Sequence, residues 1–432
     1  MASLSYPQAV SFIESLPSPA EWSLETPRRL YSLLGIDLRC EVLHVAGTNG
    51  KGSSCAFASE ILRRSGYSVG TYTSPHLRRY NERISVNGRQ ITDSEFAASV
   101  AETADAVKKM RKTDALTPST FEALTSAALL HFQRRNLDFL VLEAGLGGRL
   151  DATNVVNARV ALITNAGLEH TAELGPSISA IAREKAGIIK PGARAVTGCV
   201  QPSALAQIRA ACRKNRASLK ELGRDFSFGL QSATLEGTEF DYRGENDYAG
   251  LRSSLLGRHQ ASNASCAIAA VERFRGLGFK IPETAVRAGV LNARWPGRLE
   301  VVRRRPLVVL DGAHNPHGAR ALAAAIRDLL PGRRPVLVLG MLADKDFPRM
   351  ISILAPLASR IIFCRPESAR AAEPALLAAE ARKAGCKNVE VVISVAKAVS
   401  RGILLAGPAG AVVVAGSLYA VGSARPSFGK GL

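Results

Sequence analysis

A glycine-rich turn between a strand-like run and a helical pattern most constrains how this chain folds. Residues 42–46 are mostly apolar, and the residues that follow are Gly47-Thr48-Asn49-Gly50-Lys51-Gly52-Ser53. Glycines let backbone N–H groups close around phosphate oxygens, the next helix adds a favourable dipole, and the lysine adds positive charge. Gly52 separates Lys51 from Ser53, which departs from the standard P-loop. A glycine-rich turn of an ordinary α/β domain is therefore the alternative.

Strand-like and helix-like segments alternate along the first half of the chain, which indicates a parallel sheet covered by helices. The pattern predicts strands at 42–46, 68–72, 137–143, 159–164 and 194–198. It predicts helices at 51–65, 93–112, 118–135, 177–187, 203–215 and 261–276. Aromatic and aliphatic residues that recur between turn formers predict β-hairpins at about 224–256.

The alternation restarts after Trp295-Pro296-Gly297-Arg298, with strands expected near 307–311, 335–340, 359–364, 389–393 and 411–415. We therefore expect an ATP-binding domain over 1–296 and a smaller, Rossmann-like α/β domain over 297–432. The apolar stretch 403–416 contains Gly407, Pro408 and Gly410 and reads as a buried strand with its turn. It is too short to span a membrane.

Composition narrows the function classes. Seven cysteines, an odd number without C-x-x-C pairs, favour a reduced, cytoplasmic compartment, and no secretory signal is recognisable. The formal net charge of +19 suits nucleic acid or small polyanionic substrates. Because the basic residues are dispersed and aromatic residues make up only 6% of the chain, nucleic-acid binding is disfavoured as the main function.

The strand expected at 137–143 ends in Glu143. Ligands of open α/β sheets bind beyond the carboxyl ends of the strands, so this carboxylate should emerge near the Lys51 loop. A magnesium ion bound to phosphates needs oxygen ligands there. The alternative is that Glu143 caps the glycine-rich turn that follows.

Two further polar residues lie at or near strand exits. His170 follows the strand expected at 159–164, although a single histidine is usually structural. Lys185 falls in the apolar stripe of the helix expected at 177–187. A buried lysine is costly unless it is paired or neutral, and a neutral amine can add carbon dioxide to form a carbamate that binds metal. Snorkelling to the surface, or pairing with a carboxylate, is the alternative.

Two clusters lie past the middle of the chain. Arg298 sits at the expected domain boundary, where it can reach a phosphate. Asp311-Gly312-Ala313-His314-Asn315-Pro316 follows the first strong strand of the second domain. Pro-Gly and Asn-Pro also form turns, so turn chemistry alone explains either cluster.

Taken together and in this order, the motifs resemble the folylpolyglutamate synthase/dihydrofolate synthase family of the Mur ligase superfamily. The resemblance extends along nearly the whole chain. It rests on the segments 47–53, Thr73-Ser74-Pro75-His76-Leu77, Asn81-Glu82-Arg83-Ile84, 143–154, Glu184-Lys185-Ala186-Gly187-Ile188, 295–298, 311–316 and Gly416-Ser417-Leu418-Tyr419.

The resemblance implies a P-loop Mur-ligase-like domain, a Rossmann-like glutamate-binding domain and the following site residues. ATP would contact Gly47, Thr48, Asn49, Gly50, Lys51, Gly52, Ser53, Asn263, Arg298 and Asp311. Two Mg²⁺ ions would be held by Ser53 and Glu143, and by His170 and carbamylated Lys185, with Ser74 nearby. Dihydropteroate or folate would contact Ser74, Pro75, Arg83, Thr120, Phe121 and Glu122, and L-glutamate would lie near His314 and Ser417.

The implied reaction joins L-glutamate to dihydropteroate, or to the glutamate tail of a folate, through an acyl phosphate formed from ATP. Lys51, Arg298, His170 and Lys185 would form the catalytic group. No membrane or nucleic-acid partner is expected, and we expect a monomer. The segment Thr120-Phe121-Glu122 favours a bifunctional enzyme. The alternatives are a folylpolyglutamate synthase alone, a cell-wall ligase of the Mur type, and an ATPase that binds nucleic acid.

Overall fold

The computed structural model describes residues 4–18, 22–114 and 116–428. The chain divides into two compact units. Unit 1 contains residues 1–229, 241–251 and 262–293, and unit 2 contains residues 230–240, 252–261 and 294–432. The larger unit carries the phosphate-type loop and the smaller one carries the cluster around Asp311.

Unit 1 is built on an eight-stranded sheet of order β4-β3-β2-β5-β1-β6-β7-β8. Its strands are β1 (Glu41–Ala46), β2 (Val69–Tyr72), β3 (Ile84–Val86), β4 (Arg89–Gln90), β5 (Phe139–Glu143), β6 (Val160–Ile163), β7 (Arg194–Thr197) and β8 (Ser218–Glu221). The central strand β1 pairs in parallel with β5 and β6. In this register Val45 lies beside Glu143 and Ala46 beside Ile163, so the three strands end together.

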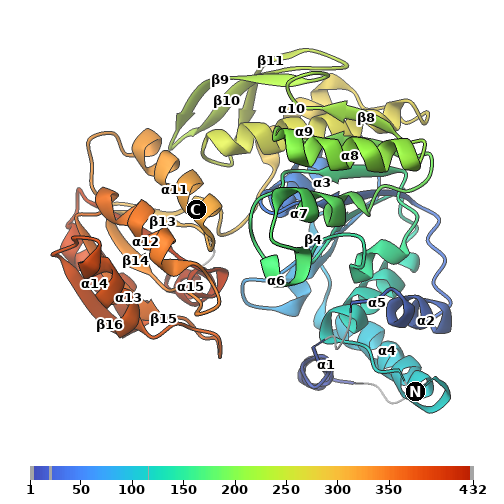
Figure 1. The fold of residues 1–432 in the computed structure, drawn as a ribbon, viewed down its shortest axis with the longest axis horizontal. Helices are drawn as coiled ribbons and strands as arrows, with labels where there is room; N and C mark the ends of the chain where they lie inside the picture. Colours follow the sequence, from blue (N-terminus) through green and yellow to red (C-terminus); the bar gives the residue numbers. More distant parts are fainter. Residues whose placement is uncertain (1–3, 19–21, 115, 429–432) are drawn as a thin grey trace. The chain divides into compact units, whose positions relative to one another are not determined.

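Helices cover both faces of this sheet (Figure 1). They are α1 (Tyr6–Glu14), α2 (Glu25–Leu33), α3 (Lys51–Arg64), α4 (Asp93–Thr113), α5 (Thr120–Gln133), α6 (Thr171–Leu174), α7 (Ile178–Ala186), α8 (Pro202–Lys214), α9 (Arg258–Arg275) and α10 (Glu283–Asn292). Helices α1, α4 and α5 pack in the cluster that includes Val42 and Leu140. On the opposite face, the ring of Phe139 meets Phe274 of α9 at 4.9 Å. A Cβ on Gly289 of α10 would lie 2.5 Å from Ile61 of α3, so these two helices approach closely.

Three further strands form a separate sheet of order β11-β10-β9. They are β9 (Ser227–Thr234), β10 (Gly237–Arg243) and β11 (Tyr248–Ser253). The buried carboxylate of Glu272 on α9 accepts hydrogen bonds from Tyr242 at 2.7 Å and from Asn246 at 3.0 Å. These bonds tie one end of the hairpins to the larger unit.

Unit 2 contains a six-stranded sheet of order β12-β13-β17-β14-β15-β16. Its strands are β12 (Glu300–Arg304), β13 (Leu307–Leu310), β14 (Val336–Leu339), β15 (Arg360–Arg365), β16 (Val389–Ser394) and β17 (Ala411–Ala415). Strand β12 is antiparallel to β13, and the other pairings are parallel. The helices are α11 (Pro316–Leu329), α12 (Phe347–Leu354), α13 (Pro374–Lys383), α14 (Val395–Ala406) and α15 (Leu418–Ala424).

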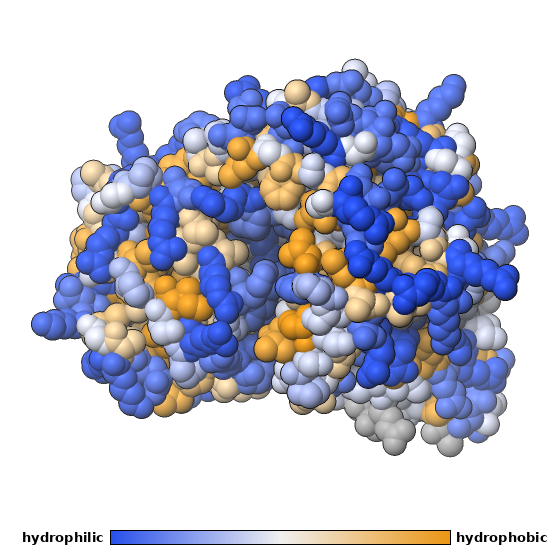
Figure 2. All heavy atoms as spheres, turned by 45° about the horizontal axis from the view of Figure 1, so that its top comes forward, coloured by the Kyte–Doolittle hydropathy of each residue, from blue (hydrophilic) through white to orange (hydrophobic). Residues whose placement is uncertain are grey.

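The mixed α/β architecture confirms the predicted fold class, and one local interpretation is wrong. Residues 403–406 complete α14, and only residues 411–415 of that apolar stretch form a strand. The sequence pattern also misses β12, which precedes the strand expected at 307–311 and contributes only two valines between charged residues. None of the helices in the described part of the chain is long and apolar enough to cross a membrane. Hydrophilic side chains dominate the face seen in Figure 2, with only small apolar patches between them.

Candidate active site

The phosphate-type loop lies between the end of β1 and the start of α3. Gly50 has a left-handed backbone (φ 81°), which glycine adopts without strain, and α3 begins at Lys51. The N–H groups of the first helical turn have no carbonyl one turn back, and the turn contains no acidic residue. Lys51 Nζ donates to the carbonyl of Gly47 at 3.0 Å, which folds its charge over the loop. The loop therefore offers free amide donors and a cation to an anion.

Polar residues beyond β6 and on α9 fix the shape of this loop. Asn165 accepts from the N–H of Asn49 and donates to its carbonyl, both at 2.9 Å. Thr48 exchanges hydrogen bonds with the backbone of Gly167. A Cβ on Gly50 would lie 2.3 Å from Asn263 Oδ1, so only glycine fits there. Asn263 thus lies directly against the loop, and the contact with ATP that the family resemblance implies for it stays a prediction.

Glu143 is buried at the end of β5, with 3% of its surface exposed. Its Oε2 accepts a hydrogen bond from the N–H of Ser74 at 3.1 Å. Its negative charge and the positive charge of Lys51 both act on the buried thiol of Cys55, whose pKa is raised mainly by burial. The carboxylate thus lies close to the first turn of α3, where Ser53 is also buried. A buried carboxylate and a hydroxyl beside a phosphate loop are oxygen donors that fit Mg²⁺.

Lys185 lies inside the protein, with only 3% of its surface exposed, so the snorkelling alternative is wrong. Burial, followed by the nearby charge of Lys51, lowers the pKa of its amine to about 7. The carboxylate of Glu169 opposes this shift. This lowering increases the share of uncharged amine near neutral pH, and the uncharged form is the one that can react with carbon dioxide.

His170 caps the short helix α6 in a left-handed conformation (φ 50°). Its side chain is about a third exposed, and its ring nitrogens lie 4.0 Å from Glu169 Oε1 and 3.9 Å from Glu173 Oε2. Glu169 thus borders both His170 and Lys185. The sequence interpretation did not include Glu169, although its position beside the predicted His170 was a usable signal.

The loop after Glu143 packs against the helix that carries Lys185. A Cβ on Gly148 would lie 2.9 Å from the carbonyl oxygens of Glu184 and Lys185. The N–H of Arg149 donates to Glu184 O at 2.8 Å, and Asn154 donates to the carbonyls of Arg149 and Gly187 at 3.0 Å. These contacts position the backbone of α7, and with it the buried lysine.

A buried polar relay links the same loop to β1. Thr153 donates its hydroxyl proton to Asp151 and therefore accepts from His44 Nε2 at 2.8 Å. Burial lowers the pKa of His44 to about 3, so this histidine is neutral. Asp151 also accepts from the N–H of Leu146 at 2.7 Å. The pairing of His44 with Thr153 was not predicted, because the two residues come from separate segments of the chain.

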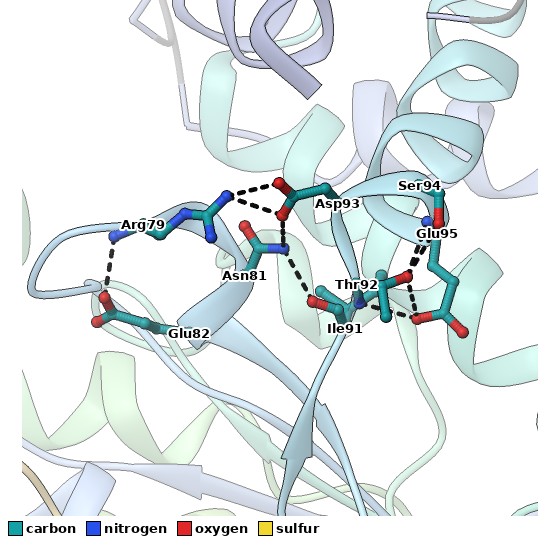
Figure 3. A network of polar contacts seen from close by, with 8 residues as sticks. All are labelled: Arg79, Asn81, Glu82, Ile91, Thr92, Asp93, Ser94 and Glu95. Carbon is teal, nitrogen blue, oxygen red and sulfur yellow. Dashed lines mark hydrogen bonds and ion pairs between the residues drawn. The ribbon is translucent and has the colours of Figure 1, made fainter. Parts of the chain in front are cut away.

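The segment from Ser74 to Arg83 connects β2 to β3. Figure 3 shows the network that anchors it: Arg79 pairs with Asp93 at 2.8 Å, and Asn81 donates to Ile91 O and to Asp93. Arg83 Nε donates to His76 Nδ1 at 3.0 Å. Burial, and then the charge of Arg83, lowers the pKa of His76 to about 3. Ser74 is half-buried, and Pro75 beside it is exposed.

The three residues at the start of α5 that were predicted to contact the acceptor make different contacts in the structure. Thr120 donates its hydroxyl to Leu16 O at 3.0 Å, and Glu122 accepts from Ser119 in a capping box. Glu122 thus caps the helix, and Thr120 binds the N-terminal segment. Phe121 instead packs against Gly145, where an added Cβ would lie 2.5 Å from the ring. Phe121 is therefore the member of this triplet that faces the loop after Glu143.

In unit 2 the predicted residues also gather at the carboxyl ends of parallel strands. Asp311 follows β13, and its buried carboxylate accepts from the N–H groups of Leu299 and Ala313 at 3.0 and 2.9 Å. Burial raises its pKa, and the charge of Arg298 opposes that shift. Arg298 lies beside Gly312, where a Cβ would be 2.9 Å from its Nη1. Among the described residues, Arg298 is held by no hydrogen bond or ion pair, so its guanidinium is free to bind an anion.

The two residues predicted to lie near glutamate occupy this same edge. His314 Nδ1 lies 2.8 Å from Gly312 O. Ser417 caps α15, accepting from Ala420 N at 3.0 Å and donating to Gly340 O at 2.7 Å. The predicted residues thus form one set in unit 1 and a second set in unit 2.

Comparison with known proteins defines the class of protein first. Residues 45–271 match the Mur ligase middle domain, and residues 297–418 match the Mur ligase glutamate ligase domain. The first match includes the phosphate loop, Glu143 and Lys185, and the second includes Arg298, Asp311 and Ser417. The chain is therefore built as a Mur ligase.

Similarities over most of the chain then identify the family. The chain is 40% identical to a dihydrofolate synthase/folylpolyglutamate synthase of Bacillus subtilis, over 77% of this chain and 78% of that protein. A folylpolyglutamate synthase of Mycobacterium tuberculosis, solved with ADP, matches with TM-score 0.92 and 32% identity over 98% of each chain. An Escherichia coli structure with DHPP and ADP matches with TM-score 0.88 and 33% identity, over 98% of this chain and 97% of that one. The chain belongs to the folylpolyglutamate synthase/dihydrofolate synthase family.

Proposed function

We propose that this enzyme is an ATP-dependent ligase that adds L-glutamate to dihydropteroate and also to the glutamate tail of folates. The observation that carries the proposal is the common edge of β1 and β5 in unit 1. There the phosphate loop, the buried carboxylate of Glu143 and the buried amine of Lys185 lie together in a member of this family. Both activities are proposed because the similar Bacillus protein is named for both and the similar Escherichia structure contains DHPP.

Ser53 and Glu143 would hold one Mg²⁺ ion with the phosphates of ATP, and His170 and a carbamate on Lys185 would hold a second, with Ser74 nearby. Oxygen donors, burial and an amine pKa of about 7 support this assignment. The ions, when bound, neutralise charge that develops on the phosphoryl and acyl groups.

The protein's own groups bind and orient the reactants. The amides of the loop and Lys51 hold the ATP phosphates while a carboxylate oxygen of the acceptor attacks the γ-phosphorus and ADP leaves. The amino nitrogen of glutamate then attacks the acyl carbon, and phosphate leaves. Segment 74–83 and Phe121 position the pterin end of the acceptor. Arg298, Asp311, His314 and Ser417 serve the nucleotide and glutamate.

The cellular setting is also part of the proposal. All seven cysteines are free, and five of them are buried, which supports a reducing, cytoplasmic location. We propose that the enzyme works there as a monomer, as the family resemblance implies. We propose no nucleic-acid partner for it.

Phosphate release from MgATP with L-glutamate tests the function, with dihydropteroate, tetrahydrofolate or no acceptor. Stimulation by both acceptors, with the glutamylated products found by mass spectrometry, is the expected result. Stimulation by tetrahydrofolate alone would establish a folylpolyglutamate synthase without the second activity. Release that no acceptor raises above the background rate would overturn the proposal.

A further inference from the structure

Five of the arginines of unit 2 gather at one end of its sheet. Strands β13, β17 and β14 run in parallel, with Leu307 paired to Ala411 and Val336 to Val412, so their starts lie side by side. The end of β12 with the turn after it, and the loop before β14, carry exposed basic residues that we call the amino-edge arginines: Arg303, Arg304, Arg305, Arg333 and Arg334. This end of the sheet is opposite the carboxyl ends of the strands, where the candidate site residues of unit 2 lie.

Hydrogen bonds join the loops at this end into one surface. A guanidinium N–H of Arg333 donates to the carbonyl of Ala409, in the loop before β17. Arg334 donates to Pro356 O at 3.3 Å, in the segment before β15. Neighbouring strands are about 4.8 Å apart, so the starts of β13 and β14, two spacings apart, lie within about 10 Å of each other. The amino-edge arginines therefore crowd one small face of unit 2.

This face carries almost no negative charge to balance the arginines. Aspartate and glutamate are absent from the segments that form it, which are 303–306, 331–335, 355–359 and 407–410. In the part of the chain that the structure describes, Arg304 is the only amino-edge arginine with an ion pair, a contact of 4.0 Å with Glu236 in which both side chains are mostly exposed. Three of the others donate to backbone carbonyls instead. Like charges repel one another within a Debye length of about 8–10 Å, and a bound polyanion removes that cost.

Exposed aliphatic side chains lie beside this positive charge. Leu404, in the last turn of α14, is 71% exposed, and its carbonyl accepts from the N–H of Gly407 at 3.3 Å. Pro408 and Ala409 follow, both exposed, in the loop that Arg333 contacts. The four segments contain no aromatic residue on which a nucleic-acid base could stack. Arginine forks beside protruding aliphatic groups suit a lipid surface, because headgroup phosphates bind the cations and the acyl boundary accepts the leucine.

We propose that this end of unit 2 is a peripheral binding site for anionic membranes. The amino-edge arginines pair with headgroup phosphates, and Leu404 enters the boundary between headgroups and acyl chains. The cytoplasmic leaflet of a cell membrane carries anionic lipids, which agrees with the proposed cytoplasmic location. Asp311 and Ser417 lie at the other end of the sheet, so a bilayer on this face leaves them uncovered. For peripheral contacts, the proposal replaces the expectation from the sequence that there is no membrane partner.

Co-sedimentation of the full-length enzyme with lipid vesicles tests the site. The wild type should bind vesicles of equal parts phosphatidylglycerol and phosphatidylcholine, lose this binding as salt is added, and bind vesicles of phosphatidylcholine alone far more weakly. The double variant Arg304→Gln/Arg334→Gln should bind the anionic vesicles about 25-fold more weakly, at about fivefold for each arginine. Arg111→Gln/Arg213→Gln, which removes the same charge from α4 and α8 of unit 1, is the matched control and should bind within about twofold of the wild type. Unchanged melting temperatures show that the variants fold.

Leu404→Gln separates a lipid surface from other polyanions. Loss of the inserted leucine should weaken binding to the anionic vesicles severalfold without changing its salt dependence, and binding of a labelled single-stranded RNA should stay the same. Equal binding of the wild type to both kinds of vesicle, or equal losses in the two double variants, would overturn the site. RNA binding that depends on Arg304 and Arg334, together with vesicle binding that is indifferent to Leu404→Gln, would overturn the assignment to lipid. None of these measurements uses turnover, so failure of the membrane site leaves the proposed function standing.

Discussion

Both units place polar residues at the carboxyl ends of parallel strands, but these residues make different contacts in the two units. In unit 1, the edge of β1 and β5 buries groups that cost stability, such as the amine of Lys185 and the carboxylate of Glu143. In unit 2, the polar side chains at the edge of β13 and β17 form hydrogen bonds with the backbone: Asp311 accepts from two N–H groups and Ser417 caps a helix. Arg298 is the exception there. Asp311 and Ser417 therefore have structural roles beside the ones proposed for them.

Replacing Lys185 should give the largest effect and the clearest contrast. Lys185→Ala should lower the ligation rate at least about 10³-fold while nucleotide still binds, because the phosphate loop makes separate contacts. Turnover and ADP binding by calorimetry measure the two effects. Burying an amine away from water costs free energy, and methionine removes that cost. Lys185→Met should therefore raise the free energy of unfolding by roughly 1–2 kcal/mol. Normal turnover in Lys185→Ala would exclude the carbamate.

Glu143→Gln should raise the Mg²⁺ concentration needed for half-maximal rate by roughly 10–100-fold, because an amide is a weaker metal ligand. The side chain keeps its size and can still accept from the N–H of Ser74, so the melting temperature should change little. A titration of the rate with Mg²⁺ measures the effect. An unaltered metal dependence would mean that Glu143 serves only as a turn cap.

Asp311→Ala should behave in the opposite way to Lys185→Met. It leaves the N–H groups of Leu299 and Ala313 without their acceptor in a buried place, which should destabilise unit 2 by about 2–4 kcal/mol. Denaturant unfolding measures the loss, and Asp311→Asn, which keeps one acceptor, should lose less. If Asp311→Ala were as stable as the wild type, the contrast between the two units would be wrong.

The pH dependence of the ligation rate tests the role proposed for Lys185 in unit 1. The pKa of Lys185 is about 7, and carbamate forms only from the neutral amine, so the rate should rise as pH increases from 6 to 8. In buffer depleted of carbon dioxide, added bicarbonate should restore the rate severalfold at pH 8 and less at pH 6. A rate indifferent to bicarbonate at both pH values would contradict this.

Ser417→Ala should give the smallest effect. Loss of the cap of α15 should cost about 1 kcal/mol of stability. If the hydroxyl also lies near glutamate, KM for glutamate should rise while KM for ATP stays constant. A loss of stability with both KM values constant would leave Ser417 as a helix cap alone.

Sequence patterns predicted the parts of this protein that are set by local chemistry. Apolar runs predicted β1, β5 and β14 to within two residues at each end. Helical spacing placed Lys185 in the apolar stripe of its helix but left snorkelling open, and the structure decides for burial. Weakly apolar edge strands such as β12 were missed, because only their neighbours stabilise them. Partnerships between distant segments, such as His44 with Thr153, leave no periodic signal and required the structure.

The contact of Gly50 with Asn263 has a consequence for the synthesis of this protein. The phosphate loop and the helix against it come from distant parts of the chain; the neighbouring bond from Ser54 to Asn263 spans 209 residues. Helix α10, which packs on α3 at Gly289, follows later still. The ribosome must therefore translate through the hairpins and α10 before the nucleotide loop gains its last supports. Until then, the growing chain presents an unfinished loop, and a chain truncated before α9 would lack these supports permanently.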